Sequence, residues 1–255
     1  MRARVVTVVT AVGAMVVLAG CAPAADEGGS VGEAAGPALE QTSTELLQVT
    51  EPHALTGGTL LEGPTFHDDG SLFVVDVMAP AGEAKVLRID VEEASAEQIF
   101  TDETSAFTSA QFHPSDGRLC LTDFLGGGVL SSTPDGEDPQ DHFTGAVEGV
   151  AMLPDDIAFA TDGTMFVTDT RGMDGPGWET PGRVVRIGVD GTASVLADDL
   201  PSPNGIVFDE EDGVSGVTQL TEDAEQVFLV DGVQAGARFV KDVGQAGQCR
   251  ADLRG

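Results

Sequence analysis

The stretch Ile157-Ala-Phe-Ala-Thr-Asp-Gly163-Thr-Met-Phe-Val-Thr-Asp169 places a turn with an acid and a glycine between two short apolar runs, and it ends on an aspartate. Three other stretches repeat this pattern, at residues 64–76, 110–123 and 205–218. Their turn glycines, Gly70, Gly117, Gly163 and Gly213, are 47, 46 and 50 residues apart. Alternating apolar residues around such a turn are typical of a β-hairpin. The chain therefore contains four copies of one hairpin unit.

Each copy is followed by a second pair of short apolar runs. The pairs are 84–90 with 96–100, 127–132 with 142–143, 182–187 with 193–197, and 225–230 with 237–240. No stretch beyond residue 45 has a clear 3.6-residue apolar period, so we expect an all-β fold. Small four-stranded sheets repeated every 40 to 50 residues are typical of a β-propeller.

The fourth copy carries Ser215-Gly216 where the first carries Leu72-Phe73, so we predict a weak strand there. About four blades are then present, with the last one weakened. A ring that does not close leaves a blade face and strand edges exposed.

The N-terminus has the pattern of an export signal. Arg2 and Arg4 precede an apolar run over residues 5–17, which ends at Leu18-Ala-Gly-Cys21. This tetrapeptide resembles a bacterial lipobox, which implies lipidation of Cys21 and anchoring to the outer face of the cytoplasmic membrane. The alternative, a transmembrane helix, normally needs about 20 apolar residues. We therefore predict a signal peptide over residues 1–20, a flexible tether over 21–45, and a folded region over 46–255.

The formal net charge is −31, from 12 Lys and Arg against 43 Asp and Glu. Nucleic acid is excluded as a partner, because phosphate binding requires a basic face. Most of the acids solvate the surface, but a few that cluster could hold a hard cation. We expect a monomer that contacts the membrane only through its lipid anchor.

Cys120 stands where two sister repeats carry Phe73 and Phe166, so we expect a small buried core residue. The alternative is a disulfide with Cys249, which an exported chain permits.

Three residues with oxygen-bearing side chains, Glu62, Asp155 and Asn204, precede the innermost predicted strands of different repeats. The innermost strands of a propeller line its central channel, so these side chains should converge. Carboxylate and amide oxygens form a ligand set that suits Ca²⁺. The alternative is that each is an ordinary turn residue.

Three motifs resemble the SMP-30/gluconolactonase/LRE family, most closely its Drp35-type lactonase branch: Leu61-Glu-Gly-Pro-Thr-Phe66, Asp155-Asp-Ile-Ala-Phe159 with Val167-Thr-Asp-Thr-Arg-Gly172, and Leu196-Ala-Asp-Asp-Leu-Pro-Ser-Pro-Asn-Gly-Ile-Val-Phe208. The resemblance implies a six-bladed propeller that holds a divalent cation, most often Ca²⁺, and hydrolyses lactones. It places Glu62, Asp155 and Asn204 on the metal ligands. The implied chemistry is polarisation of the lactone carbonyl and activation of water by the cation, with a carboxylate moving the proton.

Other catalytic motifs are lacking, including a Gly-x-Ser-x-Gly elbow, a phosphate-binding Gly-rich loop with Lys, and a His pair at metal spacing. His67 and His113 share one repeat position, so we expect them to serve the blade architecture.

The family's further metal-site Asp, which is also its proton-transfer residue, lies in a Gly-Pro-Asp-Ser-like motif. Residues 244–255 lack that motif, and Asp252 does not match it. The catalytic residue therefore stays unassigned. Codons permitted for 246–249 read Pro-Asp-Ser when shifted by one base, so we hypothesise a frameshift or a truncated C-terminus. The branch's second calcium site also finds no match around residues 126–148.

The segment 171–182 contains the single tryptophan, Trp178. It is either a substrate loop over the channel or an ordinary surface loop. Three functions remain open: a calcium-dependent lactonase or related ester hydrolase, a propeller lipoprotein that binds a ligand or a protein without catalysis, and an inactive fragment of a lactonase.

Overall fold

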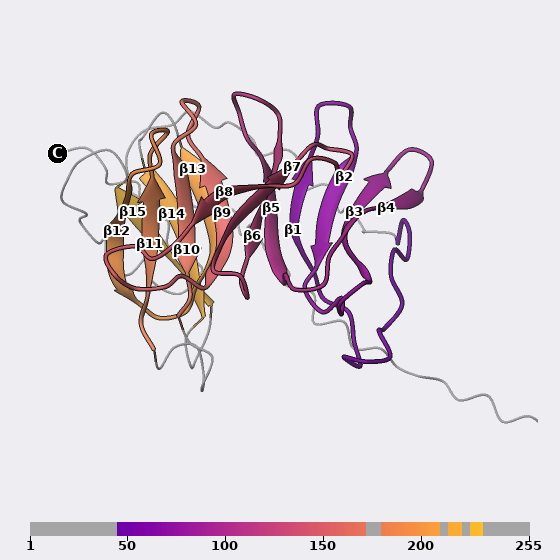
Figure 1. Cartoon of the computed structure of the whole chain (residues 1–255), viewed down its shortest axis with the longest axis horizontal. Helices are drawn as coiled ribbons and strands as arrows, with labels where there is room; N and C mark the ends of the chain where they lie inside the picture. The colour runs from indigo at the N-terminus through magenta and orange to yellow at the C-terminus, as the bar shows by residue number, and fades with distance from the viewer. Residues whose placement is uncertain (1–44, 172–179, 210–213, 221–224, 232–255) are drawn as a thin grey trace, which may run out of the picture. The chain divides into compact units, whose positions relative to one another are not determined.

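The computed structural model describes residues 45–171, 180–209, 214–220 and 225–231 (Figure 1). All of them belong to one compact unit, Leu39–Asp242. The described residues form fifteen β-strands and no helix, so no helix among them could cross a membrane. The predicted all-β fold is confirmed. Residues 1–44, with the predicted signal peptide, Cys21 and most of the tether, lie outside the described residues.

The strands form consecutive antiparallel sheets in chain order (Figure 1). The first sheet contains β1 (Leu61–Phe66), β2 (Leu72–Asp76), β3 (Ala84–Asp90) and β4 (Ser95–Thr101). The second contains β5 (Phe107–Phe112), β6 (Leu119–Asp123), β7 (Gly128–Ser132) and β8 (Gln140–Thr144). The third contains β9 (Pro154–Phe159), β10 (Met165–Asp169), β11 (Gly182–Ile187) and β12 (Ala193–Leu200). Each sheet is one propeller blade.

The fourth sheet contains three described strands, β13 (Pro203–Asp209), β14 (Val214–Leu220) and β15 (Glu225–Asp231). The strand predicted to be weak, β14, pairs with β15 over its whole length, Ser215 with Val230 and Gly216 with Leu229. Backbone hydrogen bonds do not require the large apolar side chains that the first repeat has at the positions of Ser215 and Gly216. The predicted partner strand at 237–240 lies outside the described residues.

Three hydrophobic clusters lie between consecutive sheets. One contains Phe73 and Leu121 from the first two sheets, and the next contains Cys120 and Ile157 from the second and third. Val184 and Val217 belong to the cluster between the third and fourth. Cys120 is a fully buried free thiol, as the sequence predicts, and burial raises its pKa to about 12.

The aspartate that ends each of the first three repeats fixes the start of its own sheet. Asp123 Oδ1 accepts a hydrogen bond from Ala106 N–H at 3.1 Å, immediately before β5. Asp76 and Asp169 accept equivalent bonds from the residues before β1 and β9, Leu60 at 3.1 Å and Leu153 at 2.9 Å. The repeated acid is therefore structural, because it pairs the end of the second strand with the entry to the first.

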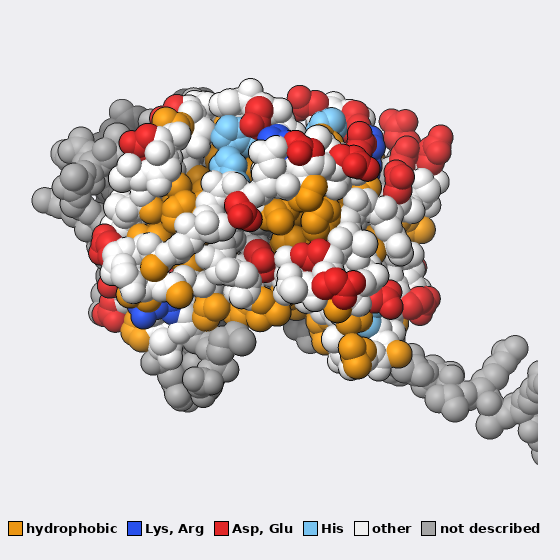
Figure 2. Space-filling model, in the orientation of Figure 1, with side chains coloured by type: hydrophobic (Ala, Val, Ile, Leu, Met, Phe, Trp, Pro, Cys, Tyr) orange, Lys and Arg blue, Asp and Glu red, His pale blue; other side chains and the backbone are white. Residues whose placement is uncertain are grey.

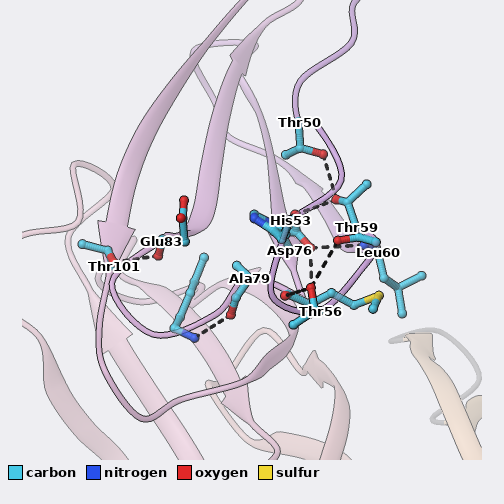
Figure 3. Close-up of polar contacts among 12 residues, drawn as sticks. Thr50, His53, Thr56, Thr59, Leu60, Asp76, Ala79, Glu83 and Thr101 are labelled. Carbon is cyan, nitrogen blue, oxygen red and sulfur yellow. Dashed lines mark hydrogen bonds and ion pairs between the residues drawn. The ribbon is translucent and has the colours of Figure 1, made fainter.

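Asp76 shows how completely such an acid is satisfied (Figure 3). Its Oδ2 accepts a hydrogen bond from Thr59 Oγ1 at 2.6 Å and contacts His53 Nε2 at 2.9 Å. Its Oδ1 accepts two backbone N–H groups, from Leu60 and Met78. The segment before β1 is thus held against the end of β2.

Large exposed hydrophobic side chains occur on both terminal sheets of the described series. Leu61 and Phe66 of β1 are 41% and 64% exposed, and Val207 of β13 is 65% exposed. Acidic side chains are spread between apolar ones over the face drawn in Figure 2. Large hydrophobic side chains are also exposed in turns of the second and third sheets, where Leu125 and Val189 are 60% and 73% exposed.

Candidate functional site

One cavity of about 160 Å³ lies where the first strands of the four sheets come together. Strand β1 contacts β5, β5 contacts β9, and β9 contacts β13. The walls of the cavity are polar, and residues from all four strands form them: Glu62, Gly63, Pro64, Thr108, Ser109, Gln111, Asp155, Asp156 and Asn204. The three residues predicted to be metal ligands, Glu62, Asp155 and Asn204, therefore line the same cavity.

One equivalent position of each repeat contributes a side chain to the cavity wall. This position lies four residues before the phenylalanine that ends or nearly ends each first strand, and it carries Glu62, Thr108, Asp155 and Asn204. Sequence reasoning identified three of the four and missed Thr108. The signal was present, because Phe66, Phe112, Phe159 and Phe208 align the repeats.

Asp155 and Asn204 contact each other directly across two blades. Asn204 Nδ2 donates a hydrogen bond of 2.8 Å to Asp155 Oδ2. Their backbones are held from the preceding blade, because Thr122 Oγ1 donates to the Asp155 carbonyl at 2.8 Å and Thr168 Oγ1 donates to the Asn204 carbonyl at 2.6 Å. The two threonines occupy the same repeat position, just before the structural aspartates. The fold thus positions both side chains through their main chain.

The cavity concentrates negative charge. Burial and then the nearby charges of Glu62 and Asp156 together raise the pKa of Asp155 to about 7, while the hydrogen bond from Asn204 opposes the shift. Burial and then the charge of Asp156 also raise the pKa of Glu62. Carboxylates that raise one another's pKa are typical of functional sites, where a cation or a proton relieves the repulsion.

Asp156 is a further acid of the cavity wall that sequence reasoning did not single out. Its Oδ1 accepts hydrogen bonds from Ser109 Oγ at 2.5 Å and from Ile157 N–H at 2.8 Å. Its Oδ2 accepts Ile206 N–H at 2.8 Å. Burial raises the pKa of Asp156, and these hydrogen bonds oppose the shift. Its neighbour Asp155 matched a motif, which left the second acid of the pair unassigned.

The backbone around Gly63 explains why the Leu61-Glu-Gly-Pro motif has a glycine at this position. Its φ is +54°, and a Cβ added there would lie 2.5 Å from the Ser109 Cα and 2.6 Å from the Ala110 nitrogen. The backbones of β1 and β5 therefore approach too closely for any side chain. This contact places Glu62 beside the second blade.

A family model described as "SMP-30/Gluconolactonase/LRE-like region" matches residues 60–228, which include every residue of the cavity wall. The chain belongs to the SMP-30/gluconolactonase/LRE-like family. No curated protein sequence matches it significantly.

Solved structures share the fold of this SMP-30/gluconolactonase-like chain. A gluconolactonase from Xanthomonas campestris is 22% identical, with a TM-score of 0.58 over 71% of this chain and 62% of that one. Regucalcin, a calcium-binding protein from Agrobacterium tumefaciens, is 14% identical, with a TM-score of 0.52 over 71% and 58%. Nidogen, in a complex with laminin, is 18% identical, with a TM-score of 0.57 over 71% and 64%. The chain thus spans about three-fifths of the length of these structures.

The SMP-30/gluconolactonase resemblance implies a divalent cation, and the donor chemistry of the cavity fits one. Glu62 and Asp155 offer carboxylate oxygens, and Asn204 offers an amide oxygen once its side chain turns by 180° about its last torsion. Within the described ranges, no three His, Cys, Asp or Glu side chains lie close enough to form a metal cluster. The predicted ligand set combines two carboxylates, Glu62 and Asp155, with the amide of Asn204.

The remaining predicted residues divide into two groups. Trp178 lies outside the described residues, so the substrate loop stays a prediction. The alternative of a disulfide between Cys120 and Cys249 is contradicted, because Cys120 is a free thiol. His67 packs against Phe73 and Phe112, and His113 packs against Phe159. Both histidines serve the packing of the blades, as the sequence predicts.

Proposed function

We propose that this protein is a calcium-dependent lactonase, or a related hydrolase of carboxylic esters, with its active site in the cavity formed by β1, β5, β9 and β13. The observation that carries the proposal is the convergence of Glu62, Asp155 and Asn204 in one polar cavity. These are the positions that the family resemblance assigns to the metal.

We assign the side chains of the cavity to metal binding and to substrate orientation. Glu62, Asp155 and Asn204 would hold the cation, which supplies a Lewis acid that polarises an ester carbonyl. Thr108 and Gln111 line the same cavity and offer hydrogen-bonding groups that can orient a small cyclic ester. The hydrogen bond between Asn204 Nδ2 and Asp155 Oδ2 keeps the two side chains adjacent before any ligand binds. Binding a cation through the amide oxygen would then require Asn204 to turn about its last torsion.

Hydrolysis of a panel of lactones by purified protein, with calcium and with EDTA, tests the proposal. We expect turnover only with calcium, and we expect Glu62→Gln to abolish it. Glu137→Gln, a change of the same kind at an exposed residue of a turn beside β7, is the matched control and should retain activity. Calcium-independent turnover, or full activity in Glu62→Gln, would overturn the proposed function.

The second candidate is a propeller that binds a ligand or a protein without catalysis. Nidogen favours it, because a protein with this fold is known in complex with laminin. Tight calcium binding without turnover of any lactone would support this candidate. A protein that binds neither calcium nor lactones and lacks cooperative unfolding would instead be an inactive fragment.

We further propose that the protein is exported, anchored through a lipid on Cys21 and monomeric. The lipobox-like Leu18-Ala-Gly-Cys21 supports the anchor. Labelled palmitate should enter the wild type and not Cys21→Ser, and equal labelling of both would refute lipidation at this residue.

A further inference from the structure

Asp156 joins three blades at the cavity. It lies on β9, its Oδ1 accepts the hydroxyl of Ser109 on β5, and its Oδ2 accepts the N–H of Ile206 on β13. A third bond from Ile157 N–H fixes the carboxylate within its own strand. Three of the four strands that form the cavity wall therefore meet on one side chain.

Each of these bonds lies next to a position that the proposed site uses. Asp155 directly precedes Asp156, and Asn204 lies two residues before Ile206. Ser109 directly follows Thr108 in the wall. A change in the spacing of these strands would therefore move Asp155 and Asn204 relative to each other.

The equivalent residues of the other blades are smaller: Gly63 in β1, Ser109 in β5 and Gly205 in β13. At Gly63 the backbones of β1 and β5 lie in direct contact, with no room for a Cβ. Between β5, β9 and β13 a whole carboxylate fills this place. The side chain of Asp156 thus bridges the strands on the side of the cavity that carries Asp155 and Asn204.

The bonding pattern requires a carboxylate. All three partners of Asp156 donate, and they are divided between its two oxygens. An asparagine would turn its NH₂ group towards an N–H donor in either orientation, so at least one of the three hydrogen bonds would be lost.

We propose that Asp156 is a positioning residue for the cation site: it holds β5, β9 and β13 at the spacing that brings Asp155 and Asn204 together, without itself binding the cation. The proposal rests on the proposed function and deepens it. Residues that orient metal ligands change metal affinity by about 10- to 100-fold when they are replaced.

Calcium affinity, measured by titration calorimetry on the chelator-treated protein, tests this role. We expect Asp156→Asn to weaken calcium binding by about tenfold while it retains one site per chain. Ser109→Ala removes one of the three hydrogen bonds to Asp156, so it should weaken calcium binding by a smaller factor. Asp155→Ala, which removes a proposed ligand, should abolish binding.

Matched controls separate positioning from general destabilisation. Asp123→Asn makes the same change at a carboxylate whose two donors, Ala106 N–H and Gly126 N–H, both bind Oδ1, so an amide keeps both. Ser132→Ala truncates a buried serine of β7 that is absent from the cavity wall. Calcium affinity should be unchanged in both.

Two outcomes of the calcium titrations would overturn the positioning role of Asp156. Unchanged calcium affinity in Asp156→Asn, with only a lower melting temperature, would reduce Asp156 to a structural residue and overturn the proposal. Complete loss of binding in Asp156→Asn with wild-type affinity in Ser109→Ala would make Asp156 a ligand, which also overturns it.

Crystal structures separate this proposal from the proposed function. If the wild type binds no calcium, the proposed function fails. The positioning role is then decided by the contact between Asp155 Oδ2 and Asn204 Nδ2, which is 2.8 Å in the wild type. A longer contact in Asp156→Asn supports the role, and an unchanged one overturns it.

Discussion

Asp123 and Asp155 are both aspartates of the repeated unit: Asp123 lies at the end of β6 in the second blade, and Asp155 lies near the start of β9 in the third. Asp123 faces two backbone N–H donors, from Ala106 and Gly126, and belongs to the structural set with Asp76 and Asp169. Asp155 faces the carboxylates of Glu62 and Asp156 and has a single amide donor. In a chain this acidic, the partners of a carboxylate therefore indicate its role better than its residue type does.

The largest effect is expected at the structural acid that also forms a buried ion pair. Asp169 Oδ2 lies 2.7 Å from Arg183 Nε, and both side chains are almost fully buried. Asp169→Ala would leave the Arg183 charge uncompensated, so we expect a loss of about 3–5 kcal/mol in the free energy of unfolding, measured with urea. Asp190→Asn at an exposed turn is the control and should change little. A loss no larger than the control's would show that the ion pair contributes nothing.

Asp155→Asn tests the acid of the cavity, in contrast to the structural acids. It replaces a carboxylate ligand with a neutral amide, so it should weaken calcium binding and slow lactone hydrolysis by about 100-fold or more, since a Lewis acid contributes several kcal/mol to such reactions. The free energy of unfolding without calcium should not fall, because the substitution removes a repelled charge. Wild-type calcium affinity in this variant would exclude Asp155 from the site.

The same acid should make the metal-free fold sensitive to pH. The pKa of Asp155 is raised from 3.8 to about 7 in the folded state, so the folded state binds this proton more tightly than the unfolded state does. Its stabilising contribution is full below pH 3.8 and is lost as pH rises through 7.

Melting temperatures in EDTA between pH 4 and pH 8 check this dependence. The wild type should lose stability over that range relative to Asp155→Asn, which lacks the group. Calcium should remove the difference at high pH. Parallel pH profiles for the two proteins would contradict the raised pKa.

The smallest effect is expected for Asp123→Asn. Both of its backbone donors bind Oδ1, so an amide retains them, and the loss in unfolding free energy should be about 1 kcal/mol or less. Calcium affinity should not change. A large loss of affinity here would remove the distinction between structural and cavity acids.

Much of the fold was predictable because its signal is local. The turn glycines and alternating apolar runs, for example Gly163 within 157–169, predict hairpins from neighbouring residues alone. The second strand pairs followed from the same pattern, and β3, β7 and β11 lie where it placed them. The burial of Cys120 followed from its repeat position.

The site was predictable only in part. Glu62, Asp155 and Asn204 could be identified because motifs mark them, and Thr108 could have been found by aligning the repeats. The role of Asp156 could not, since its donors on Ser109 and Ile206 lie 47 and 50 residues away in other blades.

The sequence by itself determined the repeat, the hairpins and the oxygen-bearing residues at the strand entries, because these depend on the order of neighbouring side chains. Only the tertiary structure decided which acids are satisfied and which repel one another. Asp169 and Asp155 end up in opposite environments because strand pairing within the third sheet brings Arg183 to Asp169, whereas the packing of the blades brings Glu62 to Asp155.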